Sequence, residues 1–157
     1  MKLFYKKLQT EIKINAPIEI VWNILEDFEA YRVWNSFCRK VETTKEIGDP
    51  FIMTIYMKPD SKPIIQKEIF SDYEPPHTVG WKLNWGVALK THRIQTLSKV
   101  DDRNTHYYTH DEFWGLLTPL VMLLYKNDMM KGFRNVAGEL KDRAESVYRR
   151  KLESSNM

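Results

Sequence analysis

The sequence of 157 residues contains a single cysteine, Cys38, so no disulfide bond can form within the chain. It also lacks long apolar runs, because the longest, at residues 120–125, is far too short to cross a bilayer. The N-terminal residues lack the apolar stretch of a signal peptide. We therefore expect a soluble, cytoplasmic protein with no stable insertion into membranes.

The signatures of several common chemistries are missing as well. There is no pair of cysteines and no HExxH motif. His106 and His110 share a strand face but lie about 13 Å apart along the chain, which is too far for one ion. No GxSxG, GxGxxG or phosphate-binding Gly-rich loop occurs. The sequence therefore predicts no metal site and no cofactor.

Charge is modest, with a net charge of +3 and basic residues gathered near the two ends, as at 149–151. A short basic run is usually a solvated surface, and no nucleic-acid-binding motif accompanies it. We expect no nucleic-acid partner, and the oligomeric state stays open. The 43% hydrophobic and 29% charged residues are typical of a globular protein, which excludes a disordered or fibrous chain.

Helices are expected near both ends of the chain. One begins after Pro17, which fits the first turn of a helix, and a second short helix follows at 29–34. A third, long helix is expected at about 118–148, where nothing interrupts it. Gly132 and Gly138 lie inside this helix, and each costs on the order of 1 kcal/mol relative to Ala. They indicate either close packing on a neighbour or a bend.

Between residues 36 and 115 the pattern changes to the period of two that is typical of strands. In residues 79–85 the alternation is cleanest, with Val79, Trp81, Leu83 and Trp85 on one face. Short turn signals separate successive strands, which favours an antiparallel meander. The sequence therefore predicts an α+β fold in which an antiparallel sheet packs against the long C-terminal helix.

The register of the last hairpin decides which side chains face the interior. If residues 101–104 form a four-residue loop, Arg93 faces Glu112 on an outer, polar surface. His92 then lies on the inner face, diagonal to Asp111 and within reach of a longer side chain. The prediction is an aromatic inner wall that carries one His–Asp pair.

This wall supplies the candidate site. A two-residue turn at 86–87 places Trp81 opposite His92. The catalytic candidates are His92 and Asp111, two titratable groups in apolar surroundings, although such a pair can equally be a satisfied structural one. The tryptophans can equally be ordinary core residues. The predicted ligand-contacting residues are Trp34, Phe51, Met53, Ile55, Trp81, Leu83, Trp85, His92, Ile94, Tyr107, Asp111, Phe113, Met129 and Phe133.

Nine segments, in order, resemble the START-like superfamily, also called SRPBCC or the polyketide cyclase/dehydrase and lipid transport superfamily. They are 14–22 (INAPIEIVW), 25–31 (LEDFEAY), 34–35 (WN), 48–49 (GD), 74–76 (EPP), 79–81 (VGW), 91–92 (TH), 111–117 (DEFWGLL) and 119–120 (PL). The resemblance covers about residues 8–148. It implies one START-like domain over 1–157 with a helix-grip fold, in which about seven curved strands wrap around the C-terminal helix.

The resemblance also implies an internal cavity for a small hydrophobic ligand, such as a lipid or a polyketide. Our first hypothesis is a protein that binds or transports such a ligand. The alternative is an enzyme of the polyketide cyclase/dehydrase sort that acts on a hydrophobic substrate in the same cavity. A third hypothesis is a protein-interaction module that uses the basic C-terminal tail or outward aromatics such as Tyr108 and Trp114.

Overall fold

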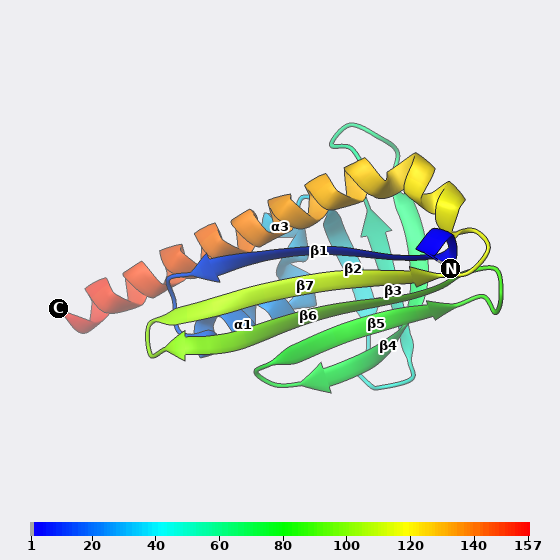
Figure 1. The fold of residues 1–157 in the computed structure, drawn as a ribbon. Coiled ribbons are helices and arrows are strands. Elements are labelled where there is room, and N and C mark those ends of the chain that lie inside the picture. The colour runs from blue at the N-terminus through cyan, green and yellow to red at the C-terminus, as the bar shows by residue number, and fades with distance from the viewer. Residues whose placement is uncertain (1) are drawn as a thin grey trace.

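A curved, open sheet of seven antiparallel strands holds one long C-terminal helix (Figure 1). The computed structural model describes residues 2–157, and Met1 lies outside the described residues. The strands follow the order β1-β7-β6-β5-β4-β3-β2 across the sheet. The α+β helix-grip fold expected from the sequence is confirmed, with short helices after the first strand.

The elements follow one another as a meander after the first strand. The strands are β1 (Tyr5–Ile14), β2 (Cys38–Thr43), β3 (Pro50–Ile55), β4 (Ile64–Glu74), β5 (Thr78–Asn84), β6 (Lys90–Asp101) and β7 (Asn104–Trp114). The helices are η1 (Lys2–Phe4), α1 (Ile18–Glu26), η2 (Phe28–Ala30), α2 (Tyr31–Trp34) and α3 (Thr118–Ser155). The last helix therefore continues seven residues beyond the expected end at 148.

A solid apolar core fills the space between α1, the sheet and the C-terminal half of α3. Val21 and Leu25 of α1 and Leu140 of α3 are fully buried there. Thr105 Oγ1 donates to the carbonyl of Ala16 at 2.7 Å, which joins the start of β7 to the segment before α1. These contacts join α1, β7 and α3 at this end of the molecule.

Polar contacts fasten α3 along the same half. Lys141 Nζ donates to the carbonyl of Lys13, and Glu145 accepts from the backbone N–H of Asn15 at 3.1 Å. Glu139 accepts from both the backbone N–H and the hydroxyl of Ser36. Across residues 2–157, no helix is both long and apolar enough to span a membrane.

The two glycines of α3 have different surroundings. A Cβ at Gly132 would collide with the ring of Phe37, whereas a Cβ at Gly138 would meet no atom within 4 Å. Gly132 therefore marks close packing of α3 on the segment before β2, the first of the two expected explanations. Gly138 has no packing reason in the structure.

We predict opposite effects for alanine at these two positions. Gly138→Ala should raise the free energy of unfolding by about 0.5–1 kcal/mol, because Ala favours the helix and meets no neighbour. Gly132→Ala should lower it by about 1–2 kcal/mol, because displacement of the Phe37 ring outweighs the same helical gain. Urea denaturation of both variants checks this, and stabilisation by Gly132→Ala would contradict the close contact.

Candidate functional site

A β-bulge near the β6–β7 turn determines the inner face of these strands. Asp101 pairs with Asn104, but the register shifts between Lys99 and Asp101, and Lys99 then pairs with Thr105. Val100 is the extra residue. The four-residue-loop register therefore holds only at the tip of the hairpin, and every later pair differs from the prediction by one residue.

The shift reverses the predicted faces of β6. Arg93 pairs with Asp111 and not with Glu112, and its side chain is 8% exposed where a solvent-facing residue was predicted. Gln95 is likewise buried. The β5–β6 turn is also longer than two residues, so Trp81 pairs with Arg93 and not with His92. The predicted faces were wrong because a strand that slips by one residue exchanges its two surfaces.

The predicted His92–Asp111 pair does not form. His92 lies on the outer face of the sheet, where its Nε2 is 2.7 Å from Asp72 Oδ2, and Ser71 donates to the same oxygen. Asp111 keeps its predicted inward position. The basis for catalysis by this pair was therefore wrong.

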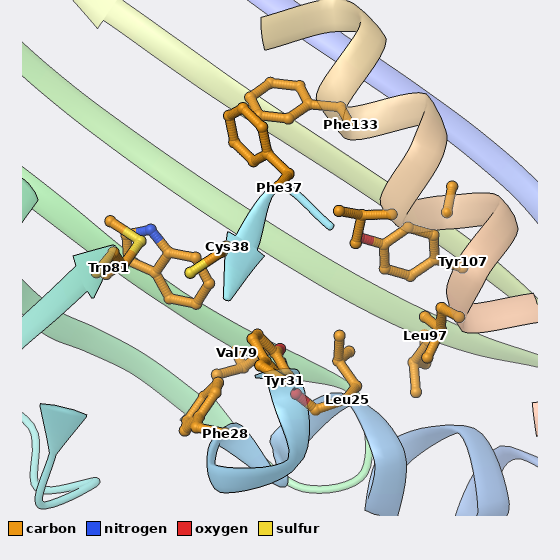
Figure 2. Packing of buried hydrophobic residues seen from close by; sticks show 14 of the residues in the cluster. Leu25, Phe28, Tyr31, Phe37, Cys38, Val79, Trp81, Leu97, Tyr107 and Phe133 are labelled. Carbon is orange, nitrogen blue, oxygen red and sulfur yellow. Dashed lines mark hydrogen bonds between the residues drawn. The ribbon is translucent and has the colours of Figure 1, made fainter. Parts of the chain in front are cut away.

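A cavity of about 280 Å³ lies between the sheet, the segment 31–38 and the N-terminal half of α3. Apolar side chains such as Leu83, Phe113 and Met129 form most of its wall. Figure 2 shows Phe37 next to Phe133 of α3, and their rings meet edge to face with centroids 5.8 Å apart. These two rings both line the cavity, on its α3 side.

The predicted ligand-contacting residues fall into three groups. Those that line the cavity are Met53, Ile55, Trp81, Leu83, Trp85, Asp111, Phe113, Met129 and Phe133. Phe51, Tyr107 and Trp34 lie outside the lining; Phe51 stacks on the Trp81 ring at 4.2 Å, and Tyr107 donates to Gln95 at 2.6 Å. His92 and Ile94 are on the outer face because of the register shift. Contact with a ligand therefore remains a prediction for the nine residues that line the cavity.

A cluster of polar side chains interrupts the apolar wall on the sheet side. Glu68 of β4, Thr91 and Arg93 of β6, and Asp111 of β7 all line the cavity. Thr91 donates to Glu68 Oε1 at 3.2 Å. Arg93 Nε donates to Thr109 Oγ1 at 2.8 Å, and its guanidinium stacks over the Phe133 ring, 3.7 Å from the centroid.

Burial shifts the two carboxyl groups of this cluster toward their neutral forms. It raises the pKa of Glu68 to about 8, with repulsion from Asp111 adding to the rise and Thr91 and Arg93 opposing it. It raises the pKa of Asp111 to about 7, against the attraction of Arg93. Near neutral pH, Glu68 is therefore mainly a carboxylic acid, and Asp111 is divided between its two forms.

Cys38, the single cysteine of the sequence, also lines the cavity, but its thiol is not suited to act as a nucleophile. Cys38 is buried, and this burial raises the pKa of its thiol to about 12. A thiolate is the reactive form of cysteine, so this side chain acts as a small apolar wall residue.

Sequence reasoning missed Glu68, Thr91 and Arg93. A signal for Glu68 existed, because Phe70 follows it by two residues and a strand places such residues on one face. The isoleucines at 65 and 69 concealed this signal, because they made the opposite face look equally apolar. No sequence signal revealed the bulge that turns Arg93 inward.

Comparison with known proteins agrees with this architecture. A family model described as polyketide cyclase/dehydrase and lipid transport matches residues 6–145. No curated protein matches the chain.

Solved structures share the fold at low sequence identity. A START superfamily protein from Mycobacterium smegmatis superposes with a TM-score of 0.70 at 16% identity, covering 90% of this chain and 98% of that one. The Zhui aromatase/cyclase from Streptomyces sp. R1128 gives 0.63 at 16% identity, covering 88% and 95%. Norcoclaurine synthase from Thalictrum flavum, solved with dopamine and hydroxybenzaldehyde, gives 0.66 at 12% identity, covering 90% and 87%. At these identities the likeness shows the fold alone.

The raised pKa of Glu68 predicts a pH-dependent stability effect. A carboxyl whose pKa is higher in the folded state binds extra protons there, so its unfavourable contribution grows as pH rises from the usual carboxyl range to about 8. As pH rises from 5 to 9, the free energy of unfolding of Glu68→Gln should therefore increase relative to that of the wild type by on the order of 3 kcal/mol. Urea unfolding at the two pH values measures this difference.

Glu145→Gln is the matched comparison. Burial alone would raise the pKa of Glu145, but Lys141 and the N–H of Asn15 lower it overall. The stabilisation from a lowered carboxyl pKa is complete above the usual carboxyl range, so this variant should lose the same stability at pH 5 and pH 9. An equal effect of Glu68→Gln at both pH values would contradict the burial of its charge.

Proposed function

Because the chain belongs to the polyketide cyclase/dehydrase and lipid transport family, we propose that it binds one small, mainly apolar molecule in the cavity between the sheet and α3. The cavity of about 280 Å³ carries this proposal. A dry cavity of about 150 Å³ is enough for benzene. The volume here suits a molecule of about two rings.

Aromatic rings behind the cavity wall support Trp81, which favours binding over collapse. Trp81 stacks on Phe51 with an interplanar angle of 14°, and Phe28 meets Phe51 edge to face at 5.2 Å. Such aromatic contacts hold each ring in one orientation. Apolar volume that the surrounding side chains do not fill lowers stability, so a ligand that fills it gains the missing contacts.

The cavity has a route to the surface at the N-terminal end of α3. Trp85 lines the cavity and is 57% exposed, and Val121 and Tyr125 of α3 also line it while partly exposed. Leu117 N–H donates to the carbonyl of Ala88 at 2.9 Å, which ties the β5–β6 loop to the start of α3. We assign the rim formed by Trp85, Val121 and Tyr125 as the entrance of the cavity.

A substitution that fills the cavity tests the proposal. Wild-type protein should bind naphthalene and 2-methoxynaphthalene saturably, with one molecule per chain in isothermal titration calorimetry. Leu83→Trp should weaken both at least tenfold, because Leu83 is a buried wall residue and the indole occupies the ligand volume. Leu152→Trp, near the C-terminus and outside the lining, makes the same exchange and should change nothing. Absence of saturable binding to the wild type would refute the proposal.

A cyclase/dehydrase-type enzyme is the second candidate function, and the cluster of Glu68, Arg93 and Asp111 favours it. One carboxyl near neutral pH can donate a proton and the other can accept one, beside a guanidinium that stabilises a developing oxyanion. In dehydration of a β-hydroxy ketone, Asp111 would take the α-proton and the electron pair of that C–H bond would form the C=C bond. The C–O bond would break, and the proton of Glu68 would leave with the hydroxyl as water.

This candidate is tested with 4-hydroxy-4-phenylbutan-2-one, whose enone product absorbs in the ultraviolet. The wild type should accelerate dehydration over buffer, and Glu68→Gln or Asp111→Asn should each lower the rate about 100-fold or more. Glu112→Gln, on the outer face beside Tyr5, is the control. No acceleration by the wild type, or unchanged rates in both cavity variants, would dismiss dehydration of such hydroxy ketones.

A further inference from the structure

Arg93 and Asp111 face each other on adjacent strands without bonding. They are direct partners in the β6–β7 register, and both line the cavity. The guanidinium of Arg93 is nevertheless held by Thr109 and stacked on the Phe133 ring. The two side chains therefore line the same cavity without an ion pair between them, and each can interact with a bound molecule.

The carboxylate of Asp111 has an unmatched hydrogen-bonding position. Its Oδ1 atom is buried and has no hydrogen-bond partner within residues 2–157. Three other buried side-chain atoms share this condition, on Trp34, His110 and Thr118, but none of those residues lines the cavity. A buried acceptor without a partner is costly, so a donor from the ligand would be favoured here.

The neighbouring polar side chains do not compete for this donor. Thr91 donates its hydroxyl to Glu68, and Gln95 accepts from Tyr107. The unmatched buried atom of the cavity wall is thus on Asp111, which accepts when ionised, and its strand partner Arg93 can only donate.

We infer that the ligand carries a neutral hydroxyl group, of the alcohol or phenol class, which donates to Asp111 and accepts from Arg93. This inference rests on the proposed binding function. An ammonium group could pair with Asp111 but would meet the positive charge of Arg93, and a carboxylate could pair with Arg93 but would meet Asp111, so neither matches both side chains. An ether or ketone accepts from Arg93 but leaves Asp111 Oδ1 without a donor. A hydroxyl is the simplest group that serves both side chains.

A set of bicyclic probes of equal shape separates these alternatives. The full-length wild type is titrated calorimetrically at pH 7.5 with 2-naphthol, 2-methoxynaphthalene, naphthalene and 2-naphthoate. The hydroxyl compound should bind at least about tenfold more tightly than the ether, because only the hydroxyl donates to a charged acceptor. The ether should bind more tightly than naphthalene through Arg93, and the carboxylate should bind most weakly.

Substitution at Asp111 identifies the acceptor. In Asp111→Asn the side-chain amide can also donate to an ether, so the preference for 2-naphthol over 2-methoxynaphthalene should fall below about threefold. Asp72→Asn makes the same change on the outer face and should keep the wild-type preference. Circular dichroism confirms that both variants fold.

The outcomes distinguish the inference from the function on which it rests. If no probe binds the wild type, the proposed function and the inference both fail. If the three neutral probes bind equally, or if the carboxylate binds best, the cavity binds ligands but the inference is overturned. A hydroxyl preference that Asp111→Asn leaves intact also overturns it, since another group then accepts the proton.

Discussion

The pairing of Arg93 with Asp111 is the constraint on which the chemistry of the interior depends. It follows from the bulge at Val100, which adds one residue to β6 just before the β6–β7 turn. The bulge determines on which face of the sheet each remaining side chain of β6 lies, because strand residues alternate strictly between the two surfaces. The cavity consequently receives a guanidinium and a threonine, whereas the outer surface receives His92. The strand register, and not the composition of the strands alone, therefore determines which polar side chains line the cavity.

Stability and binding are divided between the two halves of the interior. Around α1 the side chains pack without a large cavity, and Lys141, Glu139 and Glu145 fasten α3 there. The other half contains an unfilled volume and two carboxyls whose charged forms burial disfavours. Both features lower the stability of the folded state. The solid half compensates for them, since a domain needs only a small net free energy to remain folded.

The fold was accessible from the sequence because its signals are local and repeated. Alternation in 79–85, turn residues between strands and an uninterrupted helical segment at the C-terminus each depend on neighbouring residues. Apolar wall residues such as Leu83 and Phe113 were found for the same reason. Thr91 and Arg93 of the polar cluster were not found, because the face on which they lie depends on one extra residue at Val100 and on a five-residue loop after Asn84. Either feature moves a whole strand by one position and leaves the hydrophobic pattern almost unchanged.

The contact between Gly132 and Phe37 has a consequence for the size of the ligand. The ring of Phe37 touches the backbone of α3 on one side and borders the cavity on the other. Any side chain at position 132 would move the ring away from the helix and toward the ligand volume. The upper limit on ligand size therefore depends on a residue that does not itself line the cavity. A substitution at Gly132 would therefore change the volume of the cavity without replacing any residue of its wall.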